Sequence, residues 1–217
     1  MRDEFERQLA LLNEELTTMG GLIESAIANA VKALDGDEHS INKAYDYEKS
    51  IDNKEREIES LSLKLLLTQQ PVASDLRLIS AALKMITDIE RVGDQSADIA
   101  DLNIQLIKKK QKWDLSDISE MARAATQMVN DAIDAYVNDD ENLARKVISS
   151  DDKIDELFVK TKDKIIDEIA ADKANSEKAI DTLMVAKYFE RIGDHAVNIA
   201  EWVVFSVTGV HKTERIM

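Results

Sequence analysis

The 217-residue chain contains no cysteine, one proline and six glycines. Without cysteine, disulfide bonds and thiolate metal sites are excluded. So few glycines and prolines leave few turns, which favours a small number of long elements. Strand signals are also missing, because no β-branched alternation is bounded by Asn-Gly or Asp-Gly. These absences together predict an all-α fold.

Positive charge and long apolar runs are also scarce. The net charge of −15 argues against direct binding to nucleic acid or adhesion to anionic lipid, so any link to a membrane is expected to run through a protein partner. No run approaches 18 apolar residues, which predicts no membrane span. The start, MRDEFERQLALL, is amphipathic and acidic, unlike a signal peptide. A cytoplasmic protein is expected, with a surplus of negative charge that suits divalent or trivalent cations.

Apolar residues recur at helical spacing along almost the whole chain, and a few polar breaks such as LDGDEHS and VNDDEN interrupt the pattern. Most of the resulting helices span about 30 residues, or about 45 Å. Long helices with short connections pack as antiparallel bundles. The pattern predicts six helices, at residues 4–34, 38–69, 72–109, 115–138, 141–171 and 176–208.

The six helices form two sets of three. ERVGDQSADIAD at 90–101 and ERIGDHAVNIAE at 190–201 share six of twelve residues at an offset of 100. EKSID at 48–52 matches DDKID at 151–155 at an offset of 103, and IESAIANAV weakly echoes VNDAIDAYV. Three echoes in the same order indicate duplication, and the unit is far longer than a solenoid repeat. We therefore predict two three-helix bundles, at residues 1–110 and 115–217.

Acidic pairs lie four residues apart at repeat-equivalent positions. Residues at this spacing share one helix face, so Glu90 and Asp94 point the same way. If the second and third helices of each half face one another, four carboxylates converge in each bundle. The converging acids are Glu48, Asp52, Glu90 and Asp94 in the first half, and Asp151, Asp155, Glu190 and Asp194 in the second.

A solvated surface is the simplest interpretation of any single acidic pair, because 43 of the 217 residues are acidic. However, like charges at this spacing destabilise a helix, and the pairs recur in both halves. This recurrence favours a bound cation. Oxygen ligands suit magnesium, calcium, manganese or ferric iron, and zinc also accepts carboxylates. The Glu-x-x-His pairs of ferritin-type di-iron enzymes are missing, and we interpret His195 as a surface or packing residue.

Arginine and glycine flank these acids in both halves. We interpret Arg91 and Arg191 as ion-pair partners of the acids and not as anion binders. Gly93 and Gly193 would allow a neighbouring backbone or a bulky cluster to approach, or simply a close helix crossing. No glycine-rich phosphate loop, nucleophile elbow or HExxH motif is present, so no enzyme activity is predicted.

Longer phrases of the sequence resemble the PhoU family of bacterial phosphate-uptake regulators over essentially the whole chain. The matching phrases are QQPVASDLRLI at 69–79, IERVGDQSADIA at 89–100 and FERIGDHAVNIAEWVVFSVTG at 189–209. The resemblance implies two tandem three-helix bundles related by pseudo-twofold symmetry. It also implies carboxylate clusters that hold multinuclear iron or zinc in some members.

Carried over by position, the resemblance implies two sets of metal ligands. Asn198 departs from the acid found at Asp98 in the first half, which lowers the ligand charge and predicts a weaker or different second site. The first set is Glu48, Asp52, Glu90, Asp94 and Asp98, and the second is Asp151, Asp155, Glu190, Asp194 and Asn198.

The resemblance also implies a role. Members of the family act as adaptors between a phosphate ABC transporter ATPase and a sensor histidine kinase, repress the phosphate-starvation response and limit phosphate import. Long helix faces suit docking, and a homodimer is the expected assembly. Two alternatives stay open, namely a helical scaffold without metal and a carboxylate-bridged metalloenzyme.

Overall fold

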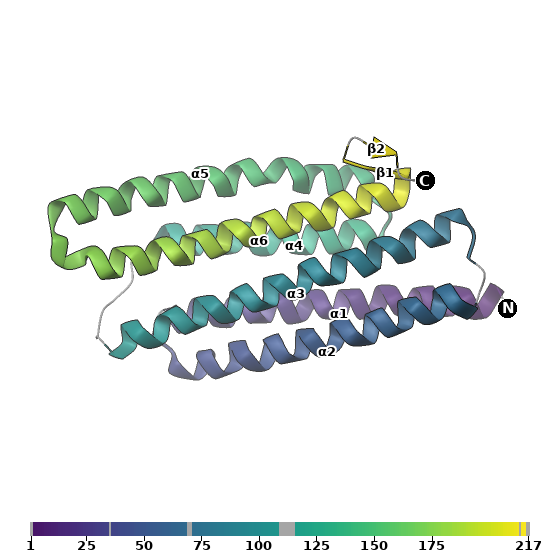
Figure 1. Ribbon diagram of the computed structural model, residues 1–217, viewed down its shortest axis with the longest axis horizontal. Coiled ribbons are helices and arrows are strands. Elements are labelled where there is room, and N and C mark those ends of the chain that lie inside the picture. The colour runs from purple at the N-terminus through teal and green to yellow at the C-terminus, as the bar shows by residue number, and fades with distance from the viewer. Residues whose placement is uncertain (1, 35, 69–70, 109–115, 213, 216–217) are drawn as a thin grey trace.

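The computed structural model describes residues 2–34, 36–68, 71–108, 116–212 and 214–215, and it is built almost entirely of helices (Figure 1). The all-α prediction is confirmed, with a single 3-10 turn and a two-residue strand pair as additions. The elements are α1 (Arg2–Leu34), α2 (Glu38–Thr68), α3 (Ala73–Lys108), α4 (Ser116–Val137), α5 (Glu141–Ala171), η1 (Lys173–Asn175), α6 (Ser176–Thr208), β1 (Val210–His211) and β2 (Glu214–Arg215).

The helix ends follow local sequence signals. The bounds predicted for α5 and α6 match those of the structure, and the other described ends lie within two residues of prediction. Asp140 caps α5 by accepting a hydrogen bond from the Leu143 amide at 3.0 Å. The tight turns before α2 and α5 use positive φ angles at Gly36 (97°) and Asp139 (52°). The predicted bounds at residues 69, 109 and 115 lie outside the described residues.

The six helices form two tandem bundles, α1–α3 and α4–α6, as predicted (Figure 1). Helix α3 packs on α1, α2 and α6, and α6 packs on α3, α4 and α5, so these two helices connect the bundles, as α1 and α4 also do. The sequence of α6 fits this position. Its buried residues point to several sides near its end, because four consecutive residues are buried there, namely Val203, Val204, Phe205 and Ser206.

One hydrophobic core runs through both bundles. Tyr136 on α4 is almost fully buried, and its hydroxyl donates to the Leu78 carbonyl of α3 at 3.1 Å. Helices α1 and α4 also meet closely at Gly20, where an added Cβ would lie 2.9 Å from Ile133 Cδ1. The two bundles therefore share apolar packing.

Helices α3 and α6 cross between the halves with matched contacts. Asn198 Nδ2 of α6 donates to Asp88 Oδ1 of α3 at 3.2 Å, and the Tyr188 hydroxyl donates to Asp98. Residues 88 and 188, and 98 and 198, are equivalent at the repeat offset of 100. Residue 88 of α3 meets residue 198 of α6, and residue 98 meets residue 188, so the two helices run antiparallel. This exchange is the local expression of the pseudo-twofold symmetry.

The chain after α6 turns back on the helix. Gly209 has a positive φ of 77°, and β1 pairs antiparallel with β2. The His211 ring stacks on Trp202 with ring centroids 3.9 Å apart. Among the described residues, no helix is both long enough and apolar enough to cross a bilayer.

Candidate functional site

The crossing of α2 and α3 gathers the predicted acids of the first half. Glu48 and Asp52 lie one turn apart on α2, and Asp94 faces them from α3. One carboxylate oxygen from each lies within 4.8 Å of the others, and all three residues are partly buried. This is the only group of at least three potential metal ligands that lies this close together within the described ranges.

Burial and mutual repulsion disfavour the charged forms of Glu48 and Asp94. The pKa of Glu48 is raised, first by burial and then by the charges of Asp52 and Asp94. Burial also raises the pKa of Asp94, and the Asp52 charge adds to this, although Arg91 opposes it. A cation among these oxygens would relieve both penalties.

Glu90 lies beside this group, together with an acid that sequence reasoning missed. Burial raises the pKa of Glu90, and the charges of Asp94, Glu55 and Asp52 raise it further. Glu55 follows Asp52 by three residues on α2, so the same spacing rule could have found it. We call Glu48, Asp52, Glu55, Glu90 and Asp94 the first acidic cluster.

Arg91 pairs with the outer edge of this cluster, as predicted. Its guanidinium lies 3.5 Å from Glu90 Oε2 and 3.3 Å from Asp94 Oδ2. The Arg91 side chain is 57% exposed, so water competes for both contacts.

Asp98 lies on the same stripe of α3 but turns to another partner. Its carboxylate accepts from the Tyr188 hydroxyl of α6, and the pKa of Tyr188 is raised by burial first and then by this acid. Asp98 is exposed and lies outside the close group, although its charge adds to the raised pKa of Asp94. One turn further, Asp101 accepts from the Tyr45 hydroxyl of α2.

The crossing of α5 and α6 gathers four acids of the second half. Asp151 is at the centre, and its pKa is raised to about 6 by burial and then by the charges of Asp155, Asp194 and Glu190. Asp194 is more exposed, but its pKa is also raised, chiefly by burial and by Glu190. We call Asp151, Asp155, Glu190 and Asp194 the second acidic cluster.

The two repeated glycines allow these crossings. A Cβ at Gly93 would lie 3.1 Å from Ile51 Cδ1 of α2. A Cβ at Gly193 would lie 3.0 Å from Ile154 Cδ1 and 3.2 Å from Asp151 Oδ1. Gly193 therefore makes room for an acid as well as for an apolar contact, and Gly93 makes room for the apolar contact.

The second cluster already contains a cation from the protein. Lys187 Nζ lies 2.5 Å from Glu190 Oε1 and also bonds Oε2. The same ammonium lies 5.4 Å from the centre of the Phe158 ring on α5. It also opposes the raised pKa of Asp194. Sequence reasoning missed Lys187, although its position three residues before Glu190 was a usable signal.

Asn198 and His195 turn away from the second cluster and toward α3. His195 Nδ1 lies 2.7 Å from Asp88 Oδ1, and Asn198 donates to the same oxygen at 3.2 Å. His195 is partly buried, and this contact places its ring between the halves. Asp88, which receives both contacts, was not anticipated.

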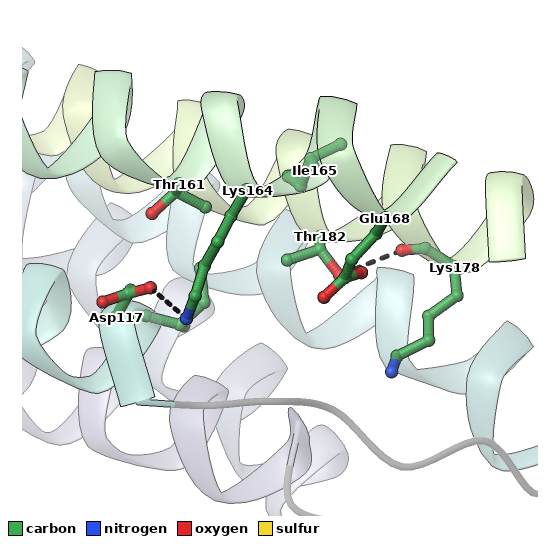
Figure 2. Close-up of a pocket in the computed structure, with 8 residues that line it drawn as sticks. Asp117, Thr161, Lys164, Ile165, Glu168, Lys178 and Thr182 are labelled. Carbon is green, nitrogen blue, oxygen red and sulfur yellow. Dashed lines mark hydrogen bonds and ion pairs between the residues drawn. The ribbon is translucent and has the colours of Figure 1, made fainter. Parts of the chain in front are cut away.

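A small cavity of about 20 Å³ lies between α4, α5 and α6, large enough for about one water molecule (Figure 2). The Asp117 carboxylate accepts from Lys164 at 2.7 Å and from Lys160 at 2.9 Å. These two lysines hold the pKa of Asp117 below its usual value. The pairing attaches the start of α4 to α5, and none of the predicted metal residues lines the cavity.

The comparisons with known proteins agree on one family. The sequence model described as "PhoU domain" matches residues 16–102 and 118–203. The chain is 34% identical over 210 residues to "Phosphate-specific transport system accessory protein PhoU homolog" of Clostridium acetobutylicum, covering 96% of each protein. It is 32% identical to the homolog 1 of Thermotoga maritima, covering 97% of this chain and 91% of the relative.

Solved structures give the same result. The crystal structure of PhoU from Pseudomonas aeruginosa superposes with a TM-score of 0.89 at 30% identity, covering 95% of this chain and 100% of the other. The structure of the phosphate transport system regulatory protein PhoU from Streptococcus pneumoniae superposes with a TM-score of 0.86. It covers 97% of this chain and 100% of the other at 24% identity, which supports the shared fold.

Proposed function

This chain belongs to the PhoU family, and on that premise we propose that it is a metal-binding, cytoplasmic regulator that limits phosphate uptake. The observation that carries the proposal is whole-length similarity to relatives named as accessory proteins of the phosphate-specific transport system. The similarity covers both bundles, so it includes both acidic clusters.

In the proposed mechanism the protein is an adaptor between the ATPase of a phosphate ABC transporter and a sensor histidine kinase. It holds its partners in the states that repress import and the starvation response when phosphate is ample. An adaptor needs differential affinity for two states of its partner and no chemistry of its own. In this proposal the protein reaches the membrane only through these partners, is not an enzyme, and assembles as a homodimer.

The residues present fit a metal. Carboxylate oxygens are ligands for iron and also for zinc. The absence of a Cβ at Gly193 leaves the room that Asp151 Oδ1 occupies, as a cradle for a ligand requires. In the first half, Glu48, Asp52 and Asp94 would hold the metal, with Glu90 beside them. A bound metal would supply positive charge that holds each helix crossing together.

The regulatory proposal is tested by deleting the gene for this chain. Expression of phosphate-uptake genes should then stay high in phosphate-rich medium, and a copy of the gene should restore repression. A pull-down from cells grown in high and low phosphate should recover the transporter ATPase and the kinase in different amounts. Uptake genes that remain repressed in the deletion strain would contradict the role.

The metal proposal is tested by elemental analysis of protein purified without chelator. Asp52→Asn with Asp94→Asn should remove most of the metal of the first half while helicity by circular dichroism stays nearly unchanged. Asp134→Asn with Asp167→Asn is the matched control, because both acids are exposed and outside the clusters. If iron, zinc and manganese neither bind nor change Tm, the metal-free scaffold is favoured. Turnover by the metal-loaded protein would favour the metalloenzyme.

A further inference from the structure

Two repeat-equivalent substitutions remove negative charge from the second acidic cluster relative to the first. Lys187 of the second half corresponds to Thr87, which carries no charge. Phe158 corresponds to Glu55 at the offset of 103. The first cluster therefore has one more acid on α2, and the second has an ammonium on α6 with an aromatic ring beside it on α5. Both differences make the second cluster less negative. A third substitution, exposed Lys49 of the first half against exposed Asp152 of the second, acts in the opposite direction on Glu48 and Asp151.

We propose that Lys187 is a built-in counter-cation of the second acidic cluster, so that the first cluster is the tighter metal site. This inference rests on the proposed metal binding. The Lys187 ammonium contacts both oxygens of Glu190 and lies near the Phe158 ring. An incoming metal would have to displace it from Glu190.

Arginine does not account for the difference, because both halves carry it at equivalent positions, Arg91 and Arg191. Arg91 pairs at 3.3 to 3.5 Å with the outer edge of the first cluster. Lys187 pairs more closely with a carboxylate that is 14% exposed. The closer contact to the more buried acid is the stronger competitor.

The inference is tested by equilibrium dialysis of the full chain, stripped of metal, against Zn²⁺. Each cluster is measured alone, in a background that lacks the other cluster. The first cluster is removed by Asp52→Asn with Asp94→Asn, and the second by Asp151→Asn with Asp194→Asn. Lys187→Met removes the charge and keeps side-chain length beside Phe158. It should lower the Zn²⁺ Kd of the second cluster by roughly fivefold, the scale of a partly exposed ion pair.

Two further variants complete the comparison. Lys187→Arg keeps a cation and should leave the second-cluster Kd within twofold of the wild type. Thr87→Lys places an ammonium three residues before Glu90 and should raise the first-cluster Kd by roughly fivefold. If Lys187→Met and Thr87→Lys both leave Kd within twofold, or if both clusters of the wild type bind equally, the inference is overturned and metal binding stands.

A metal-free measurement separates this inference from the proposed function. Without metal, Lys187→Met should lower Tm and Lys187→Arg should not, because only the former leaves the second cluster without its counter-charge. If neither wild-type cluster binds Zn²⁺, the proposed metal site is refuted, and so is the proposal that the first cluster binds metal more tightly than the second. The counter-cation role of Lys187 is then itself overturned if Lys187→Met does not lower Tm.

Discussion

The α2–α3 crossing and the α5–α6 crossing are copies of one arrangement in which the acids are compensated differently. In the first, three carboxylates face one another closely, and Arg91 lies at the exposed edge. In the second, Asp151 is surrounded by acids, and Lys187 lies against Glu190. Duplication thus preserved the geometry of the crossing while single substitutions changed its charge.

The connection between the halves shows the same divergence. The Tyr188 hydroxyl donates a hydrogen bond to Asp98. At the repeat-equivalent contact, the Asp88 carboxylate accepts a hydrogen bond from Asn198 and also contacts His195 Nδ1. An exchange of tyrosine for aspartate, and of aspartate for asparagine, keeps a donor opposite an acceptor on both sides. The halves are therefore equivalent in position and unequal in chemistry.

The largest expected effect comes from filling the close crossings. Gly193→Val should destabilise the protein by about 2–3 kcal/mol, because its side chain would overlap Ile154 and Asp151. It should also weaken metal binding to the second cluster. Urea denaturation and metal analysis measure the two effects.

Two matched variants sharpen this result. Gly93→Val should cost about as much stability as Gly193→Val, because it would overlap Ile51. Gly21→Val is the control, since nothing lies within 4 Å of its added Cβ, and it should change stability by less than about 0.5 kcal/mol. Equal costs at positions 21 and 193 would refute the close-approach role.

The next effect concerns the two contacts between α3 and α6. Asp88→Ala should cost about 1–2 kcal/mol, because it removes the acceptor of two partly buried donors, His195 and Asn198. Asp98→Ala should cost about 0.5 kcal/mol, since Asp98 is exposed. Urea denaturation compares them, and a cost for Asp98→Ala at or above that for Asp88→Ala would contradict the inequality.

A smaller effect should appear with pH. The pKa of Asp151 is raised to about 6 in the folded protein, so the folded state binds a proton more readily than the unfolded state. The stabilisation is complete below the unfolded value of 3.8 and is lost as the pH rises through 6. The free energy of unfolding of the metal-free protein should therefore be higher at pH 5 than at pH 7.5 by about 1 kcal/mol from this partly exposed group, and Tm should be higher at pH 5.

Asp151→Asn should raise Tm at pH 7.5 and flatten this dependence, because the amide resembles the protonated acid. Asp134→Asn, at an exposed position outside both clusters, is the control and should leave the slope unchanged. Thermal melts recorded every half unit between pH 4 and 8 are the measurement. If Tm depends on pH as steeply in Asp151→Asn as in the wild type, acids other than Asp151 cause the dependence.

The smallest effect is expected at Arg91. Arg91→Ala should change stability by no more than about 0.5 kcal/mol, because its pairs with Glu90 and Asp94 are exposed. The change should shrink further in high salt. A loss above 1 kcal/mol in urea denaturation would mean that Arg91 compensates the first cluster as strongly as Lys187 is proposed to compensate the second.

Much of the fold could be predicted because its signals are local. The polar break around Asp140 marks the start of α5, and the repeated ERVGD and ERIGD phrases predicted the duplicated bundle. Spacing rules along one helix also placed Glu48, Asp52 and Asp94 in one group, and the structure brings these three side chains together. The strand pair at 210–215 was missed, since two-residue strands carry no periodic pattern.

The helices, their duplication and the excess of acid on equivalent faces follow from the sequence alone, because periodicity and charge act between neighbours along the chain. Which acids lie together, and which side chains compensate them, depends on how the helices pack. Asp98 and Asn198 were assigned with the ligands, but contacts across the α3–α6 interface direct them to Tyr188 and Asp88. Helix rotation and the close approach at Gly193 set these pairings, and both depend on packing between segments far apart in sequence.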